Sequence, residues 1–406
     1  MLNSLLSHLD TSASLVVHLQ RHLTEIPALA PENKGDGEEQ KAQWLKGYLE
    51  QELKLNVVTC DAPDARVSSG VRPNLITTIP GKTKQTLWVI SHMDVVPAGE
   101  DSLWETPPFT LTQEGDILIG RGVEDNQQGI VTSLLVAEAL VKHNITPDIG
   151  LGIILVADEE AGMTHGLPYI LKTMPHLIAK DDLIVVPDIG NSRGNMVQLA
   201  EKSVLWLKFT VNGKQCHASS PDEGQNSLVI SSHCVIALKD LHTQFPACDE
   251  IFDPAHSTFV PTKKEANVEN INTLPGKDVF YMDCRVLPCY FLEDVQQACT
   301  NIAKTVAQKF NADIHVEAVN VNPNVNATAA SAPVVQKLCK ALQADRSLTP
   351  KLCGSSGQTV ATILRNNGYD AVAWSTLLDN AHQPNERSSI AFTIADARII
   401  MRMLYE

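Results

Sequence analysis

Short apolar runs that lead into a polar side chain recur along this chain. Four such runs lie at residues 86–91, 151–157, 183–187 and 372–377. Each is short and mostly apolar, as expected of buried strands in an α/β sheet. Helical patterns separate the runs, and the clearest covers residues 129–142. This alternation predicts an α/β domain whose mainly parallel sheet has helices on both faces.

The pattern differs at the N-terminus and after residue 200. Residues 11–60 predict a helix, a loop at 26–38 and a second helix that ends near Leu53. After residue 200 we expect a β-α-β-β-α-β order, which is typical of a ferredoxin-like α+β domain. Its strands are expected at 203–211, near 267–273, at 278–287 and at 313–319, and its helices at 226–241 and 293–310. From about residue 331 the helix–strand units resume, so we expect a catalytic domain at 1–200 and 320–406 with an inserted domain at 201–319.

Composition narrows the class of protein. The 406 residues carry 32 Lys and Arg against 47 Asp and Glu, a net charge of −15. This charge argues against binding to nucleic acid or to an anionic membrane. No apolar stretch approaches the roughly 20 residues of a membrane span, and the first residues do not read as a signal peptide. The nine cysteines include no C-x-x-C pair, so we expect a reducing, cytoplasmic location.

The polar residues that follow the strands are the candidate chemistry. Because parallel strands present their carboxyl ends at one edge of a sheet, we expect these side chains to converge there. His92 directly follows the first run and is a candidate metal ligand. Asp94 is then expected to hold the His92 ring through its other nitrogen. The alternative for this segment is a polar strand end that binds nothing.

Two further segments carry acidic residues. Asp125 ends the glycine-flanked segment 120–125, where its two oxygens could bridge two cations. It could instead cap the following helix. In the Glu159–Glu160 pair, one carboxylate can bind metal while the other accepts a proton from water, although a solvated acidic loop has the same composition.

Asp188 and His382 complete the candidate set. Asp188 ends the third apolar run, and His382 lies in the polar turn 381–386. Each is a weak signal alone. Two histidines with three or four carboxylates are what a pair of Zn²⁺-like ions requires, which predicts a hydrolase.

Together these segments resemble the dinuclear zinc exopeptidases and deacylases. This family includes succinyl-diaminopimelate desuccinylase, acetylornithine deacetylase, aminoacylase, carboxypeptidase G and the carnosinase-type dipeptidases. The matching segments are 92–97, 120–125, 158–160, Asp188 and 382–386, together with 213–221, Asn226 and 283–288 in the inserted domain. The resemblance covers nearly the whole chain in order.

The resemblance implies a role for each site residue. Asp125 bridges two divalent ions, with Zn²⁺ as the first candidate and Co²⁺ or Mn²⁺ as alternatives, and Glu159 is the general base. The remaining ligands are His92 and Asp188 at one ion, and Glu160 and His382 at the other.

The inserted domain, by the same resemblance, is a lid that forms a homodimer. His217 on this lid reaches the active site of the partner subunit and stabilises the oxyanion of the intermediate. Arg285 binds a substrate carboxylate, although an ion pair with Asp283 is the alternative. Asn272, Gly354 and Ser355 are further substrate contacts.

The expected activity is hydrolysis of an amide bond next to a free carboxylate in a small substrate. An N-acyl or N-succinyl amino acid is the first candidate, attacked by a metal-activated hydroxide. A dipeptidase or carboxypeptidase of the same family, and a non-catalytic ligand-binding relative, are the alternatives. The chain departs from the family pattern at Asn126-Gln127-Gln128 and at Gly357-Gln358-Thr359. We expect both departures to shape the substrate pocket without touching a ligand.

Overall fold

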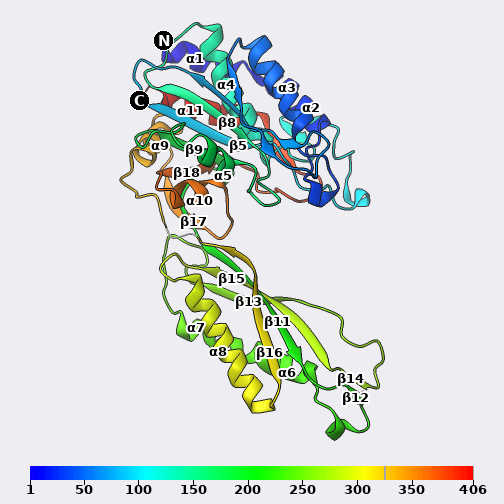
Figure 1. Cartoon of the computed structure of the whole chain (residues 1–406). Coiled ribbons are helices and arrows are strands. Elements are labelled where there is room, and N and C mark those ends of the chain that lie inside the picture. Colours follow the sequence, from blue (N-terminus) through cyan, green and yellow to red (C-terminus); the bar gives the residue numbers. More distant parts are fainter. Residues whose placement is uncertain (324–325, 406) are drawn as a thin grey trace. The chain divides into compact units, whose positions relative to one another are not determined.

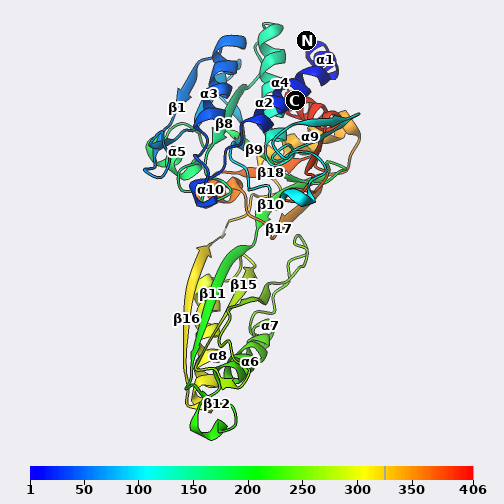
Figure 2. The ribbon, with the colours of Figure 1, turned by 90° about the vertical axis from the view of Figure 1, so that its right-hand side faces the viewer.

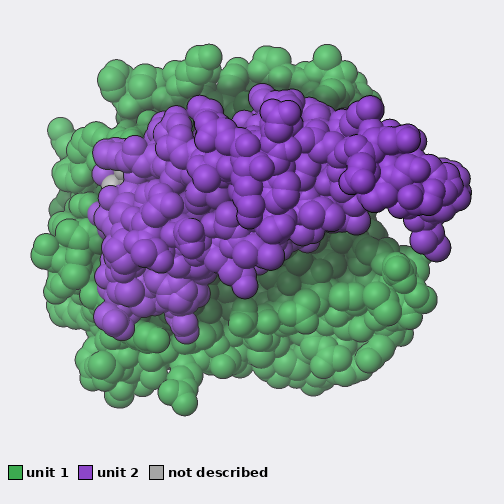
Figure 3. All heavy atoms as spheres, turned by 90° about the horizontal axis from the view of Figure 1, so that it is seen from below, with its two compact units in different colours: residues 1–199, 328–353, 359–406 green, residues 200–327, 354–358 purple. Residues whose placement is uncertain are grey.

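The computed structural model of the chain describes residues 1–323 and 326–405. These residues form two compact units, coloured separately in Figure 3. Unit 1 comprises Met1–Leu199, Thr328–Cys353 and Thr359–Glu406, and unit 2 comprises Ala200–Ala327 and Gly354–Gln358. Ala200, the described residues of 320–327 and segment 354–358, which we expected in the catalytic domain, therefore belong to unit 2. Residues 324 and 325 lie outside the described part.

In the described residues, unit 1 is built on an eight-stranded sheet (Figure 1). Its strands, in spatial order, are β1 (Val57–Thr59), β4 (Leu75–Ile79), β8 (Gly150–Val156), β5 (Thr86–His92), β9 (Leu183–Gly190), β18 (Ala371–Ser375), β10 (Met196–Glu201) and β17 (Lys351–Ser355). The four central strands β8, β5, β9 and β18 run parallel to one another. The pairs β1–β4, β4–β8 and β10–β18 are antiparallel. The parallel sheet that the apolar runs predicted is thus confirmed at its centre.

Both faces of this sheet are apolar, because alternate side chains of each central strand enter different cores. In β5, Leu87 and Val89 face one core, whereas Trp88 and Ile90 face the other. This alternation explains why apolar residues follow one another in these runs. Among the described residues, the helices that contribute to the first core are α1 (Leu2–Asp10), α2 (Ala13–Glu25), α3 (Glu39–Gly47), α4 (Gln127–Lys142), α9 (Pro333–Arg346) and α11 (Ile390–Met403). Those that contribute to the second are α5 (Leu167–Thr173) and α10 (Val360–Asn366) (Figure 2).

The N-terminal helices also match their prediction. Helix α2 is followed by a loop and then by α3 (Glu39–Gly47), which continues as a π-helical turn, η2 (Tyr48–Glu52). Three short strands, β6 (Thr112–Glu114), β7 (Ile117–Ile119) and β19 (Arg387–Ser389), form a separate sheet, and β2 (Ala62–Pro63) pairs with β3 (Val71–Arg72). Among the described residues, no helix is both long and apolar enough to cross a lipid bilayer.

The described part of unit 2 contains a four-stranded antiparallel sheet. Its spatial order is β13 (Thr258–Lys264), β15 (Lys277–Val286), β11 (Ser203–Asn212) and β16 (Asp313–Asn322). Helices α6 (Ser227–Ala237) and α8 (Leu292–Phe310) pack on one face, against Leu205, Leu207 and Phe209 of β11. The chain order β-α-β-β-α-β and this strand order are those of the predicted ferredoxin-like fold. The minor elements are α7 (Leu241–Gln244) and the pair β12 (Cys216–His217) and β14 (Thr273–Leu274).

One predicted strand is wrong. We expected a strand near 267–273, but the sheet strand is β13, which lies at Thr258–Lys264. Strand β13 is at the edge of the sheet and contains Pro261, which an edge strand tolerates because its N–H side has no neighbour. Its last residues are exposed lysines, so it lacks the apolar run that identified the other strands.

Candidate metal centre

The parallel strands of unit 1 deliver the predicted ligands to one edge of the sheet. His92 is the last residue of β5, Glu159 and Glu160 follow the end of β8, and Asp188 lies near the end of β9. His382 follows β18 on a turn in which its own φ is 64°. Asp125 immediately precedes the start of α4. The carboxyl ends of the strands therefore bring together residues from five separate segments.

Asp125 lies at the middle of the cluster, and its two oxygens face different histidines. Asp125 Oδ1 is 2.8 Å from His92 Nε2, and Asp125 Oδ2 is 3.0 Å from His382 Nε2. This is the arrangement expected of a carboxylate that bridges two cations.

One further carboxylate accompanies each histidine. Asp188 Oδ1 is 3.7 Å from His92 Nε2, and both carboxylate oxygens of Glu160 are 3.2 Å from His382 Nε2. Among the described residues, two groups of three possible ligands result, each with its atoms within 4.8 Å of one another. Both groups share Asp125, and their imidazole and carboxylate donors fit a pair of divalent ions.

The pKa values of the histidines and of Glu160 reflect the negative charge of the carboxylates in this cluster. Hydrogen bonds with Asp125 and Glu160 raise the pKa of His382 to about 10. Burial, followed by the charge of Asp125, raises the pKa of Glu160 to about 7. Burial alone would lower the pKa of His92, but its carboxylate partners raise it well above the usual range. Positive charge is therefore strongly favoured between these carboxylates.

Glu159 lies beside the ligands without belonging to either group. Its side chain is buried, and within the described structure its Oε1 has no hydrogen-bond partner. Burial is the main cause that raises the pKa of Glu159 well above its usual range. A carboxylate with a free oxygen at this place can accept a proton from water.

Asp94 is fully buried, but its contacts differ from those expected. Its carboxylate accepts hydrogen bonds from the amides of Glu159 (3.1 Å) and Glu160 (3.0 Å). His92 Nδ1 lies 3.0 Å from the backbone carbonyl oxygen of Asp94 and 3.5 Å from its carboxylate. The carbonyl therefore orients the His92 ring, because the two amides already engage the carboxylate.

Sequence reasoning missed the contribution of Glu386. This buried carboxylate accepts hydrogen bonds from the amides of Gly122, Glu124 and Asp125 at 2.9–3.0 Å, and from Arg121 Nη1 at 2.7 Å. It thus fixes the turn that carries Asp125. Its place in the turn 382–386 was the signal that could have identified it.

The first departure from the family pattern also has a different role from the expected one. Asn126 Nδ2 donates to Asp188 Oδ1 at 2.8 Å, so this residue does touch a predicted ligand. Gln127 and Gln128 are buried and form hydrogen bonds with Thr24 and with the carbonyl oxygen of Thr376. Both glutamine side chains are thus engaged within unit 1.

The remaining predicted residues belong to unit 2. His217 is exposed on β12, and the amide of neighbouring Ala218 donates to the carbonyl of Asn272. Arg285 donates to both carboxylate oxygens of Asp283, at 2.8 and 3.1 Å, and to the carbonyl of Ser356 at 2.8 Å. Gly354 and Ser355 close strand β17.

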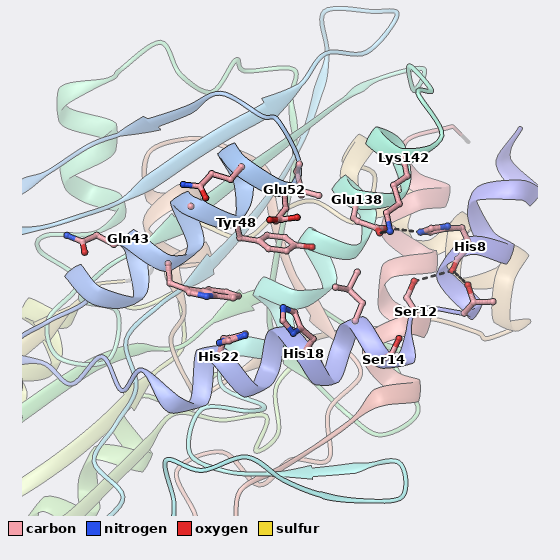
Figure 4. A pocket seen from close by; sticks show the side chains of 16 residues that line it. His8, Ser12, Ser14, His18, His22, Gln43, Tyr48, Glu52, Glu138 and Lys142 are labelled. Atoms are coloured by element: carbon pink, nitrogen blue, oxygen red, sulfur yellow. Dashed lines mark hydrogen bonds and ion pairs between the residues drawn. The ribbon is translucent and has the colours of Figure 1, made fainter.

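A cavity of about 680 Å³ lies elsewhere in unit 1, lined by side chains of helices α1 to α4 (Figure 4). The rings of His22, Trp44 and Tyr48 stack in succession along it, with centroids 4.9 and 5.9 Å apart. The buried Glu138 carboxylate lies 2.6 Å from His8 Nε2. The described residues that line this cavity include no predicted site residue, so it is separate from the metal centre.

Comparison with known proteins agrees with this geometry. The profile of peptidase family M20/M25/M40 matches residues 88–406. The chain is 36% identical over 403 residues to an uncharacterized metallohydrolase of Methanocaldococcus jannaschii, covering 96% of this chain and 98% of that one. A succinyl-diaminopimelate desuccinylase of Helicobacter hepaticus is 26% identical over 317 residues, covering 77% of this chain and 78% of the relative.

Solved structures have the same fold. The dipeptidase Dug1p of Saccharomyces cerevisiae superposes with a TM-score of 0.75 at 14% identity, covering 100% of this chain and 98% of that one. The resemblance drawn from the residues is thereby confirmed. Since the family match covers well over half of its length, this chain belongs to peptidase family M20/M25/M40 and is a metallohydrolase of that family.

Proposed function

We propose that this metallohydrolase cleaves an amide bond next to a free carboxylate in a small N-acyl or N-succinyl amino acid. The observation that carries the hydrolytic part is the Asp125 carboxylate, which faces His92 with one oxygen and His382 with the other. The name of the succinyl-diaminopimelate desuccinylase relative supports the substrate class.

The ligand roles follow from the two groups of side chains. His92 and Asp188 would hold one ion, Glu160 and His382 would hold the other, and Asp125 would contribute to both sites. When bound, such ions polarise the scissile carbonyl and acidify water. Zn²⁺ suits these donors, and Co²⁺ and Mn²⁺ are accepted by the same donor types.

Glu159 moves the proton. Its free Oε1 accepts a proton from the attacking water, and the same carboxyl returns it to the leaving nitrogen. Asp94 supports this step, because its bond to the Glu159 amide fixes the backbone from which the base projects.

Unit 2 supplies the substrate contacts. The Ser219 amide donates to His217 Nδ1 at 3.1 Å. A backbone amide can only donate, so the neutral ring carries its proton on Nε2, where it can stabilise an oxyanion. Arg285, with Gly354 and Ser355, binds the substrate carboxylate, and Asn272 contacts substrate. Arg285 already holds Asp283, so substrate must share or replace that contact.

Unit 2 also serves, in this proposal, as the lid and dimerisation domain of a homodimer, in which His217 acts at the partner's site. Neither nucleic acid nor membrane is a partner. All nine cysteines, which lie in the described part of the chain, are free thiols. Free thiols fit a reducing cytoplasm.

The test is amide hydrolysis by chelated protein before and after Zn²⁺ is restored. The substrates are N-succinyl-diaminopimelate, N-acetylornithine and a set of dipeptides. Zinc-dependent turnover of an N-acyl substrate supports the proposal, and turnover of dipeptides alone makes the protein a dipeptidase instead. If two equivalents of zinc bind and nothing is cleaved, the substrate class is wrong and the ligand assignment stands.

A further inference from the structure

Three consecutive amides at the metal centre are held by only two buried carboxylates. The Glu159 and Glu160 amides donate to Asp94, as described above, and the preceding amide, that of Asp158, donates to Glu38 Oε1 at 3.2 Å. These amides belong to the turn that carries the base and one metal ligand. The turn is therefore fixed through its backbone, which leaves the side chains of Glu159 and Glu160 for chemistry.

Glu38 is in turn held by Arg72. Arg72 Nε donates to Glu38 Oε2 at 2.6 Å, and Arg72 Nη2 bonds to Glu38 Oε1. Both side chains are 0% exposed. Arg72 Nη1 also lies 3.5 Å from Asp158 Oδ1. A two-point contact of this kind fixes orientation as well as charge.

Asp158 anchors the other side of the same turn. Its φ is 60°, in the left-handed region that non-glycine residues seldom adopt. Its Oδ2 accepts hydrogen bonds from the amides of Thr164 and His165, both at 3.0 Å. Asp158 is thus held at its backbone by Glu38 and at its side chain by the loop that follows.

The two partners come from elements that carry no ligand. Glu38 caps the start of α3, and Arg72 ends β3. Burying two charges is costly, and an apolar pair of similar volume often serves stability as well. A fully buried ion pair that bonds directly to the backbone of the Glu159–Glu160 turn therefore points to a role in geometry.

We propose that Glu38 and Arg72 are positioning residues that hold the turn carrying Glu159 and Glu160 in register with the other ligands. This inference rests on the proposed ligand roles. It concerns only residues of unit 1. Glu38 and Arg72 then contribute to metal affinity and to proton transfer, and not to fold stability alone.

The test compares Glu38→Gln with Asp345→Asn. The first variant keeps the shape of the side chain and removes its charge. The control removes the charge of another buried carboxylate of unit 1, which accepts from Arg398 Nη2 and Arg402 Nε, both at 2.8 Å, and contacts no ligand. Both variants should lower Tm. Amide hydrogen exchange of residues 158–160 is measured in chelated protein, and zinc affinity by titration in metal buffer.

For Glu38→Gln we expect about tenfold or faster exchange at residues 158–160. We also expect about 10- to 100-fold weaker binding of one zinc equivalent. Where a substrate is known, kcat at saturating zinc should fall with little change in KM. The control variant should resemble wild type in amide exchange, in zinc affinity and in kcat. Equal Tm losses with wild-type exchange and zinc affinity in both variants would overturn the inference.

If Glu38→Gln does not fold, Arg72→Lys is tested in its place. Lysine keeps the positive charge at position 72 but cannot make the two-point contact with Glu38. The same exchange and zinc results are expected of it. Amide exchange and zinc titration need no substrate. They therefore test the inference even if the proposed substrate class is wrong.

Discussion

At the scale of single residues, the two neighbouring acids Glu159 and Glu160 have separate tasks. Only Glu160 belongs to a group of possible ligands. We therefore expect Glu159→Gln to lower kcat by about 10²- to 10⁴-fold while two equivalents of zinc remain bound. Turnover at saturating zinc and the metal content of the dialysed protein check this. Loss of one zinc equivalent together with activity would show instead that Glu159 is a ligand.

The shared carboxylate predicts an asymmetry among the ligand variants. Among the described residues, His382 shares a group of possible ligands with Asp125 and Glu160 alone. His382→Ala should therefore weaken the binding of one zinc equivalent and leave the affinity for the other close to that of wild type. Asp125→Ala removes an oxygen from both groups and should weaken both equivalents. Zinc titration of the two chelated variants distinguishes these outcomes. If Asp125→Ala weakened only one equivalent, a bridging role for Asp125 would be contradicted.

Lys41 provides a prediction about pH. It is fully buried on α3, and its Nζ has no hydrogen-bond partner in the described residues. Burial lowers its pKa to about 8, although Asp94, Glu38 and Glu386 oppose the shift. In the unfolded chain a lysine has a pKa of about 10.4. Between these values the unfolded state binds more protons, so the contribution of Lys41 to the free energy of unfolding rises with pH.

The measurement compares wild type with Lys41→Met in chelated protein from about pH 7.5 to about pH 10.4. The free energy of unfolding of wild type, relative to the variant, should increase across this window. A difference that does not change with pH would mean that the folded protein keeps Lys41 protonated throughout.

At the scale of elements, the sequence predicted those helices and strands that have a clear apolar pattern. Strands β5, β8 and β9 and helix α4 were predicted because long apolar signals identify buried elements. The ligands were found because they directly follow those strands. Glu38 and Arg72 were not found, since they lie 34 residues apart, Glu38 at the end of the predicted loop 26–38 and Arg72 in a segment for which no element was predicted. Their pairing is a tertiary contact, and no local pattern records it.

Strand β8 also carries a packing constraint at Gly152. A Cβ at this position would lie 2.2 Å from the ring of Trp88 on the neighbouring strand β5. Trp88 Nε1 donates to Asp182 at 2.9 Å, so the ring cannot shift without losing that bond. We expect Gly152→Ala to destabilise the protein by about 1–3 kcal/mol.

Gly47 is the matched control for this prediction. It lies in α3, and a Cβ there would meet nothing within 4 Å. Gly47→Ala should stabilise the helix by up to about 1 kcal/mol. Thermal unfolding of both variants measures the contrast, and equal effects would mean that Trp88 can move at little cost.

At the scale of the whole molecule, the change in element order predicted an inserted unit. Unit 2 has a core of its own around Leu205, Leu207 and Phe209. Its boundaries were harder to predict, because residues 354–358 return to it from a later part of the chain. All five proposed ligands belong to unit 1, whereas His217 and Arg285 belong to unit 2. If the proposed roles hold, mutations in unit 1 and in unit 2 should therefore separate metal binding from substrate binding.

This separation allows a test of whether His217 serves the partner subunit. Alone, His217→Ala should lower kcat by about 10²-fold or more with unchanged zinc content. The Glu159→Gln variant lacks the base but keeps an intact His217. In a mixed dimer, the site of the His217→Ala subunit has its own Glu159 and receives His217 from its partner.

Equal amounts of the two variants, mixed and allowed to exchange subunits, should therefore recover activity. Half of the dimers are then mixed, and one of their two sites is complete, so about a quarter of wild-type activity is expected. A mixture that stays as inactive as its components, although native mass spectrometry detects mixed dimers, would place His217 at the site of its own subunit. If the wild-type protein is active as a monomer, no partner subunit is present, and His217 must act at the site of its own chain.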